Sequence, residues 1–220
     1  MDGGQPREAG VLVLELGSFS GGIRGAAAYG QQVTRFVYAT AASLDGFLAD
    51  ADNSLDWLFV VEGGDESLAA MGAFLEGVSV MVEGSTTYRW VLDHEELLDD
   101  PSKWQRLYGE LITYVFTSRT DLPLVPGADI RVVSGSVAEL ADELRSAAAG
   151  NDVWIVGGGD LAGQFHDAGL LDGVMLSVAA VTLGSGAPLL PRRIESSHLR
   201  LTSVRQVGQF AELHYEIRRG

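Results

Sequence analysis

The sequence predicts an α/β protein whose sheet is mostly parallel and ends in an antiparallel hairpin. Two patterns carry this prediction. Segments with the composition of strands alternate about four times with segments of helical periodicity, as in sheets that helices cover. The last part of the chain then holds consecutive strand-like segments with no helix between them, which adds antiparallel strands at one edge. A chain of 220 residues with 46% apolar content can bury the core that such a domain needs.

We expect the folded part of the chain to start near Thr34. Residues 1–33 are rich in glycine and alanine and show weak periodicity, so they offer little to pack into a core. They are therefore expected to form a poorly ordered N-terminal arm, in which Val11–Leu16 could pair as an edge strand. Residues 34–220 then form a single domain.

Segments rich in β-branched and aromatic residues, bounded by turn residues, predict the strands. A further segment, Leu55–Val61, is short and aromatic and fits either a strand or one helical turn. Gly208 separates the last two strands, as a hairpin turn requires. In chain order the predicted strands are Arg35–Ala42, Val78–Val82, Leu111–Thr117, Ile130–Val133, Asp152–Val156, Leu171–Leu183, Leu199–Val207 and Phe210–Ile217.

Four segments show the periodicity or end signals of helices. Glu66–Glu76 spaces its apolar residues three and four apart and is followed by Gly77, a typical helix end. Pro101–Tyr108 begins with proline, which suits a first helical turn. Ser136 and Glu139 form a capping box that opens a helix closed by Gly150. Asp160–Ala168 follows a glycine triplet and is the fourth.

Charge and composition exclude several classes of function. Fifteen Lys and Arg stand against 30 Asp and Glu, a net charge of −15, which repels nucleic-acid backbones. The chain has no cysteine, so disulfides, zinc–thiolate sites, iron–sulfur clusters and thiol nucleophiles are excluded. Its four histidines lie far apart without ligand spacing, so we expect no metal site. No segment reaches the ~20 apolar residues of a membrane span, and no signal peptide is evident; we expect a cytoplasmic protein.

Three glycine- or hydroxyl-bearing junctions, each at the end of a predicted strand and before a helix or turn, are the candidate functional elements. They are Gly84–Tyr88, Thr117–Thr120 and Gly157–Leu161. Glycine at the end of a strand lets backbone N–H groups reach a phosphate, and the start of a following helix favours negative charge. The glycine triplet alone fits a tight turn equally well. Three such junctions favour a dinucleotide, whose phosphates and adenosine need several backbone contacts.

A resemblance to a known family rests on six motifs in a fixed order. The chain resembles the dihydrofolate-reductase-like family and is most similar to stand-alone relatives of the reductase domain of bacterial riboflavin biosynthesis. The similarity runs from about Arg35 to the C-terminus. The motifs are Ala42-Ser43-Leu44-Asp45-Gly46, Asp56-Trp57, Gly84-x-Thr86-Thr87-Tyr88, Val115-Phe-Thr117-Ser118-Arg119, Val156-Gly157-Gly158-Gly159 and Leu183-Gly-x-Gly186-x-Pro188-Leu189.

The resemblance implies an eight-stranded, mostly parallel sheet flanked by helices and an NADPH-dependent reductase of a small heteroaromatic or carbonyl-type substrate. It also implies a homodimer in many relatives. Asp45 would be the catalytic residue, with water as the other source of a proton, and Trp57 and Tyr88 would contact substrate. The residues implied for cofactor binding are Ala39, Ala41, Gly84, Ser85, Thr86, Thr87, Thr117, Ser118, Arg119, Gly157, Gly158, Gly159, Asp160 and Leu161.

Two departures from the family pattern leave the activity open. Relatives commonly carry arginine where this chain has Ser85, so NADH is possible unless Arg89 or Arg119 meets the 2′-phosphate. The riboflavin-pathway reductases carry glutamate where this chain has Gly157, which argues against that step. The alternatives are a non-catalytic nucleotide- or pterin-binding protein on the same fold and, third, the riboflavin-pathway reductase itself.

The residues implied for catalysis and substrate also have purely structural interpretations. Asp45 precedes glycine and could simply satisfy turn backbone, as aspartate does in such turns. Tryptophan at position 57 is more often a core residue than a stacking platform for a ring. Tyr88 either stacks on substrate or packs beneath the first strand, and the sequence supports both.

Overall fold

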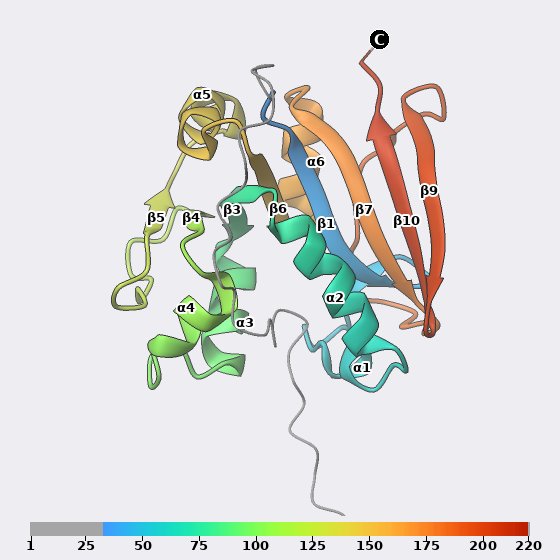
Figure 1. Ribbon diagram of the computed structural model, residues 1–220, viewed down its shortest axis with the longest axis horizontal. Helices are drawn as coiled ribbons and strands as arrows, with labels where there is room; N and C mark the ends of the chain where they lie inside the picture. Colours follow the sequence, from blue (N-terminus) through green and yellow to red (C-terminus); the bar gives the residue numbers. More distant parts are fainter. Residues whose placement is uncertain (1–32, 220) are drawn as a thin grey trace, which may run out of the picture.

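An eight-stranded twisted sheet forms the centre of the molecule, with helices on both faces (Figure 1). The computed structural model describes residues 33–219, so all of the predicted arm except Val33, including Val11–Leu16, lies outside the described residues. The strand order is β5-β4-β3-β6-β1-β7-β10-β9. Its strands are β1 (Phe36–Ser43), β3 (Val78–Gly84), β4 (Ile112–Phe116), β5 (Ile130–Val133), β6 (Asp152–Gly157), β7 (Leu171–Ala179), β9 (Leu199–Val207) and β10 (Phe210–Ile217).

The pairing confirms the predicted mixed sheet. Every neighbouring pair from β5 to β7 is parallel, whereas β10 runs antiparallel to both β7 and β9. Two short strands, β2 (Phe47–Ala49) and β8 (Ala187–Pro188), form a separate antiparallel pair that the sequence did not predict. The helices are α1 (Asp56–Phe59), α2 (Gly64–Leu75), α3 (Ser85–His94), α4 (Ser102–Tyr108), α5 (Val137–Ala148) and α6 (Gly159–Asp167).

Side chains alternate between the two faces of the sheet and build a core on each. Val80 and Val82 of β3 pack in the core that α5 and α6 cover, and Met81 between them packs in the core beneath α3 and α4. Phe165 of α6 and Trp104 of α4 are among the largest fully buried side chains of these two cores. Apolar area removed from water on both faces stabilises the sheet.

Several predicted bounds and elements differ from the structure. The ambiguous segment at 55–61 contains the single turn α1, and β7 ends at Ala179, before the predicted strand end. Helix α3 was not predicted, because its sequence begins like the motif of a loop. Strand β3 continues through Glu83, whose carboxyl is 1% exposed and has no hydrogen-bond partner at Oε1. The predicted strand ended at Val82, before the charged residue Glu83, whereas β3 continues to Gly84.

The loops at 43–50 and 180–191 are joined into one wall beside the carboxyl ends of the parallel strands. The backbone N–H of Leu44 donates to the carbonyl of Val181 at 2.7 Å, and that of Leu189 donates to the carbonyl of Gly46 at 2.9 Å. Gly186 has φ 146°, and a Cβ there would lie 2.0 Å from the carbonyl oxygen of Ala49. Only glycine fits this approach of two backbones.

The C-terminal hairpin is fastened to the start of α2. A Cβ on Gly63 would lie 2.5 Å from the Cα of Gly208 in the turn between β9 and β10. The backbone N–H of Gln209 donates to the carbonyl of Glu62 at 2.9 Å. The hairpin turn and the first turn of α2 therefore pack backbone against backbone, which fixes α2 over the sheet next to β1 and β7 (Figure 1).

Candidate functional site

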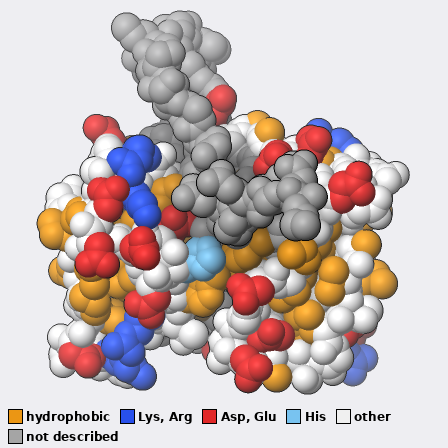
Figure 2. All heavy atoms as spheres, turned by 90° about the horizontal axis from the view of Figure 1, so that it is seen from below, with side chains coloured by type: hydrophobic (Ala, Val, Ile, Leu, Met, Phe, Trp, Pro, Cys, Tyr) orange, Lys and Arg blue, Asp and Glu red, His pale blue; other side chains and the backbone are white. Residues whose placement is uncertain are grey.

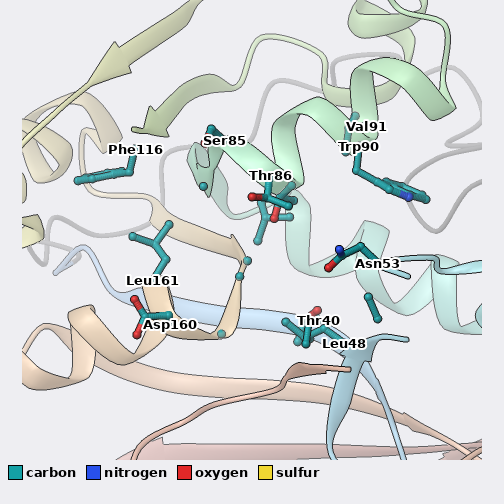
Figure 3. A pocket seen from close by; sticks show the side chains of 18 of the residues that line it. Thr40, Leu48, Asn53, Ser85, Thr86, Trp90, Val91, Phe116, Asp160 and Leu161 are labelled. Atoms are coloured by element: carbon teal, nitrogen blue, oxygen red, sulfur yellow. The ribbon is translucent and has the colours of Figure 1, made fainter. Parts of the chain in front are cut away.

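A cavity of about 760 Å³ lies across the carboxyl ends of the parallel strands, within the size range of ligand sites. Strands β3, β4, β5 and β6 each end at its wall, as in α/β folds that bind ligands at this edge. The middle of β1 forms part of its floor. Figure 3 shows side chains from α3 and α6 and from the loops after β1 surrounding this space.

Two helices begin at the cavity with glycine as the residue before the first turn. Gly84 precedes α3 and Gly158 precedes α6, and neither helix start has a side-chain cap. The first backbone N–H groups of a helix have no partner within the helix, and they carry its positive dipole end. Both helix starts line the same cavity. The cavity therefore has two positions suited to an anionic group.

One end of the cavity is lined with hydroxyl groups and one aromatic ring. Phe116 ends β4 and Thr117 and Ser118 follow it, whereas Ser134 and Gly135 follow β5. In the order of the sheet β4 is next to β3, which leads into α3, and the ring of Phe116 packs edge-on against Phe165 of α6. The residues that line this end can contact a polar ligand with a flat ring.

The other end of the cavity is mostly apolar and contains a large flat wall. Trp90 of α3 contributes this wall, and its ring stacks on His94 with centroids 4.5 Å apart. Trp154 lies in the floor and donates from Nε1 to the carbonyl of Ala39 at 2.9 Å. The side chains of Asn53 and Trp90 both line this end of the cavity (Figure 3). Also lining this end are Thr40, Ala41, Leu48, Ala49, Leu55, Leu58, Met71 and Val91.

Asp160 is the only titratable residue among the described residues that line the cavity. Its carboxylate accepts from Gln164 and from Arg192, each at 3.0 Å. These hydrogen bonds, first that of Gln164, lower the pKa of Asp160. No Lys, Arg or His of the described part of the chain lines the cavity. By contrast, acidic side chains are scattered over the face that carries α3 and α4, part of an acid-rich stretch from Ser43 to Glu110 (Figure 2).

The structure brings most of the predicted cofactor residues to one cavity. All three predicted junctions contribute to its lining, although they come from different strands. The predicted residues that line it are Ala39, Ala41, Gly84, Ser85, Thr86, Thr87, Thr117, Ser118, Gly157, Gly158, Gly159, Asp160 and Leu161. The peptide bond between Gly157 and Gly158 is cis.

Arg119, Asp45, Trp57 and Tyr88 are not among the residues that line the cavity. Arg119 is exposed one residue beyond Ser118, and its backbone N–H donates to Oγ1 of Thr117 at 3.0 Å. Trp57 packs against a small core group that includes Ala41, Leu58 and Phe210. For Trp57 the structure favours the core interpretation over a stacking platform.

The carboxylate of Asp45 holds the wall of the cavity together. It accepts from the backbone N–H groups of Leu183 and Gly184, the latter at 2.7 Å, and from the hydroxyl of Ser43 at 2.6 Å. The hydrogen bond from Ser43 and then that from Gly184 lower the pKa of Asp45. A carboxylate bound in this way favours its ionised form. The geometry corresponds to the turn interpretation of Asp45, not to a proton donor.

Tyr88 faces away from the cavity because the motif that contains it is helical. Residues one helical turn apart lie on one face, so Thr86 and Trp90 share the cavity side of α3. Tyr88 is fully buried on the opposite side, packs against Trp104, and donates from its hydroxyl to the carbonyl of Pro123 at 2.8 Å. The prediction of a substrate contact at Tyr88 is therefore replaced by its alternative, core packing.

Sequence reasoning missed the apolar end of the cavity and the residues after β5. Ser134 and Gly135 follow the predicted strand Ile130–Val133 as the other junctions follow theirs, so the same signal could have identified them. The spacing of Thr86 and Trp90 would have identified Trp90 if the helix had been expected. Asn53, Leu48 and Met71 carry no local signal, because only the tertiary fold brings them to the cavity.

The fold is that of the dihydrofolate-reductase-like class. Dihydrofolate reductase from Enterococcus faecalis, solved in complex with NADP(H), superposes with a TM-score of 0.56 at 16% identity, over 84% of this chain and 97% of that one. Within this class the chain belongs to the RibD C-terminal domain family, whose model matches residues 35–211.

The chain matches two further relatives over nearly their full length. YwjB, an uncharacterized protein of Bacillus subtilis, is 31% identical over 176 residues, which are 80% of this chain and 93% of YwjB. The structure of a proposed riboflavin biosynthesis protein from Shewanella sp. PV-4 has a TM-score of 0.70 at 23% identity, covering 84% of this chain and 100% of that one. Residues 33–219 contain no helix with the length and apolar character needed to cross a membrane.

Proposed function

We propose that the protein is an NADPH-dependent reductase of a small, flat heterocyclic substrate. The observation that carries this proposal is the single cavity that joins two uncapped, glycine-preceded helix starts to an apolar end with an aromatic wall. Membership of the RibD C-terminal domain family and the likeness to a reductase solved with NADP(H) support it.

The residues present fit a dinucleotide. A Cβ placed on Gly158 would meet nothing within 4 Å, and one on Gly84 would only reach backbone atoms at 4.0 Å. The backbone at both helix starts is therefore open toward the cavity, where it can approach a phosphate. The pyrophosphate would lie between the starts of α3 and α6, and the adenosine beside Thr117, Ser118 and Ser134.

The nicotinamide would lie at the apolar end, against Ala39 and Ala41 of β1. When bound, it supplies the hydride. The chain itself orients the flat rings: both alanines are small and buried, so a ring can lie close to the sheet. Trp90 and Leu48 border the remaining space with apolar side chains.

The proton for the reduction comes from water in this proposal. Asp160 is the single titratable residue among the described lining residues, and it lies at the start of α6 in hydrogen bonds with Gln164 and Arg192. Asp45, the other candidate, is held in hydrogen bonds to Leu183 and Gly184. Neither carboxylate is free to donate at the apolar end.

The test is a pair of measurements on the purified protein. Calorimetric titration with NADPH and NADH measures cofactor binding, and loss of absorbance at 340 nm measures oxidation of NADPH with pterins, dihydrofolate and quinones. We expect binding and turnover with at least one heterocycle. Binding without any turnover would favour the non-catalytic alternative, and no binding of either cofactor would overturn the proposal.

Valine at position 158 is expected to weaken dinucleotide binding more than tenfold while the fold survives. The Cβ of the new side chain would meet no protein atom within 4 Å, and the side chain would occupy space at the start of α6 where the phosphate would lie. Titration with NADPH measures the loss, and thermal melting checks the fold. Gly64→Val is the matched control, because a Cβ there also meets nothing within 4 Å and Gly64 does not line the cavity. Unchanged affinity in a folded Gly158→Val variant would move the phosphate site elsewhere.

Alanine at position 119 is expected to weaken NADPH about ten- to a hundredfold and to leave NADH almost unchanged. Arg119 is the cation nearest in sequence to Thr117 and Ser118, and a charge-assisted contact with a 2′-phosphate contributes about 1.5–3 kcal/mol. Titration of both cofactors separates this effect from a general loss of binding. Arg89→Ala is the comparison variant, since Arg89 is exposed on α3. Equal weakening of both cofactors, or of neither, would contradict the assignment of Arg119.

The riboflavin-pathway step is a weaker candidate. A phosphorylated substrate would need a cationic partner at the apolar end, and the described lining residues include no Lys, Arg or His. Gly157 also stands where the riboflavin-pathway reductases carry glutamate. Failure to complement a strain that lacks the reductase would agree with this ranking.

A further inference from the structure

Asp160 places a carboxylate where the proposed function requires an anion to bind. It belongs to the first turn of α6, its side chain is 68% exposed, and it lines the cavity beside Leu161 (Figure 3). Hydrogen bonds, first from Gln164 and then from Arg192, lower its pKa, so the group is ionised at neutral pH. An unpaired negative charge there would repel a pyrophosphate that binds at the start of the same helix.

Arg192 brings a positive charge directly against this carboxylate. Its Nη2 donates to Oδ1 of Asp160 at 3.0 Å, and its Nε donates to Oδ2 of Asp167, the last residue of α6, at 2.7 Å. Of the cationic side chains that the structure describes, Arg192 is the one that forms an ion pair with a residue of the cavity lining. The net charge at the start of α6 therefore depends on the pair of Asp160 and Arg192.

The guanidinium of Arg192 is held against α6 before any ligand binds. Its side chain is 24% exposed and packs on the helix at Gly163, where a Cβ would lie 2.7 Å from Cζ of the arginine. Nη1 also donates to the carbonyl of Pro191 at 2.9 Å, so all three nitrogens of the group have partners. A planar guanidinium held in this way supplies a fixed charge and has little freedom left to lose when a ligand binds.

We propose that Arg192 is a positioning residue for the dinucleotide: by neutralising Asp160, it allows the pyrophosphate to bind at the start of α6. The inference rests on the proposed function, because it assumes a dinucleotide in the cavity. It adds a residue that neither lines the cavity nor belongs to any of the three glycine- or hydroxyl-bearing junctions. Asp160 in turn suits the positive end of the helix dipole and anchors Arg192, which explains an acidic residue beside a phosphate position.

The test is a charge cycle at positions 160 and 192. Calorimetric titration with NADH and NADPH at low ionic strength measures the affinities of the wild type, Arg192→Gln, Asp160→Asn and the double variant. The two side chains together carry a net charge of zero in the wild type, −1 in Arg192→Gln, +1 in Asp160→Asn and again zero in the double variant.

The affinities are expected to follow this net charge. Arg192→Gln should weaken both cofactors about tenfold, Asp160→Asn should tighten both about three- to tenfold, and the double variant should bind within about threefold of the wild type. Added NaCl should reduce all three differences. Equal effects on NADH and NADPH are expected, because the two cofactors share the pyrophosphate; this separates the role of Arg192 from that proposed for Arg119.

The double variant distinguishes the charge of Arg192 from a purely structural role. If Arg192 only held the segment 188–191 against α6, removing Asp160 as well would not restore binding. Arg192→Lys keeps the positive charge and should bind both cofactors more tightly than Arg192→Gln does. Asp167→Asn is the matched control and should leave both affinities unchanged, since Asp167 pairs with the same guanidinium but does not line the cavity.

A double variant as weak as Arg192→Gln, or an Arg192→Gln variant with wild-type affinity, would overturn the inference. If Arg192→Gln does not fold, as judged by thermal melting, Asp160→Asn decides alone: an unchanged or weaker affinity of this variant would overturn the inference too. Such results with normal binding by the wild type leave the proposed function intact. Failure of the wild-type protein to bind either cofactor counts against the proposed function itself.

Discussion

Alanine at position 159 is expected to destabilise the fold by about 2–3 kcal/mol and to lower cofactor affinity as well. A Cβ on Gly159 would lie 2.2 Å from the carbonyl oxygen of Pro188 and 2.3 Å from that of Leu189. The backbone at 188–189 cannot move away freely, because Leu189 also donates to Gly46 and accepts from the hydroxyl of Tyr38 at 2.8 Å. Overpacking against such fixed groups typically costs about 1–3 kcal/mol.

Urea denaturation of Gly159→Ala measures the free energy of unfolding, and titration with NADPH measures the binding. Gly158→Ala is the control, because a Cβ on the preceding residue meets nothing within 4 Å. The control should be close to wild type in stability. Equal stability of the two variants would show that the contact between the start of α6 and the 188–189 segment is loose.

A rise in pH from 5 to 8.5 is expected to destabilise the wild-type protein more than a Glu83→Gln variant. Glu83 is buried at the end of β3, and this burial raises its pKa from 4.5 to about 8. The folded protein thus keeps a proton that the unfolded chain loses above pH 4.5, so stability falls as pH rises from there through about 8. A shift of this size corresponds to a loss on the order of 3–5 kcal/mol. Tyr108, whose pKa is raised by burial and by the charge of Glu83, is among the side chains that face it.

The measurement is the free energy of unfolding by urea at several pH values for both proteins. The glutamine variant has no ionisable group at position 83, so its stability should change little over this range. The difference between the two proteins should grow from pH 5 to about 8 and then level off. Parallel pH curves for the two proteins would mean that Glu83 does not keep its proton in the folded state.

Much of the fold could be predicted because its elements have strong local signals. The capping box of Ser136 and Glu139 is present as predicted, with both of its hydrogen bonds, and the terminal hairpin has the predicted bounds. Helix α3 could not be predicted in the same way. Its first turn carries Thr86 and Thr87, which are poor helix formers, and the packing of Tyr88 and Leu92 against the sheet stabilises it.

The candidate site was predictable where glycine and hydroxyl residues follow strands, and not where the wall comes from distant loops. The resemblance assigned Asp45 a catalytic role, but the carboxylate is engaged by backbone N–H groups of Leu183 and Gly184, which lie far away in the sequence. The burial of Glu212 on β10 had no local signal, because a glutamate in an alternating strand normally faces solvent, and its partner Arg205 comes from the neighbouring strand β9.

The position of β1 at the centre of the sheet has a consequence for how the chain is made. The first partners of Phe36 in the neighbouring strands are Val153 and Leu171, so β1 leaves the ribosome long before either partner exists. Its Ala39 and Ala41, on which the nicotinamide would lie, stay without a sheet until then. Pairings this distant in sequence form slowly. The binding site is therefore expected to be completed late in synthesis, when β7 pairs with β1 and the hairpin of β9 and β10 pairs with β7.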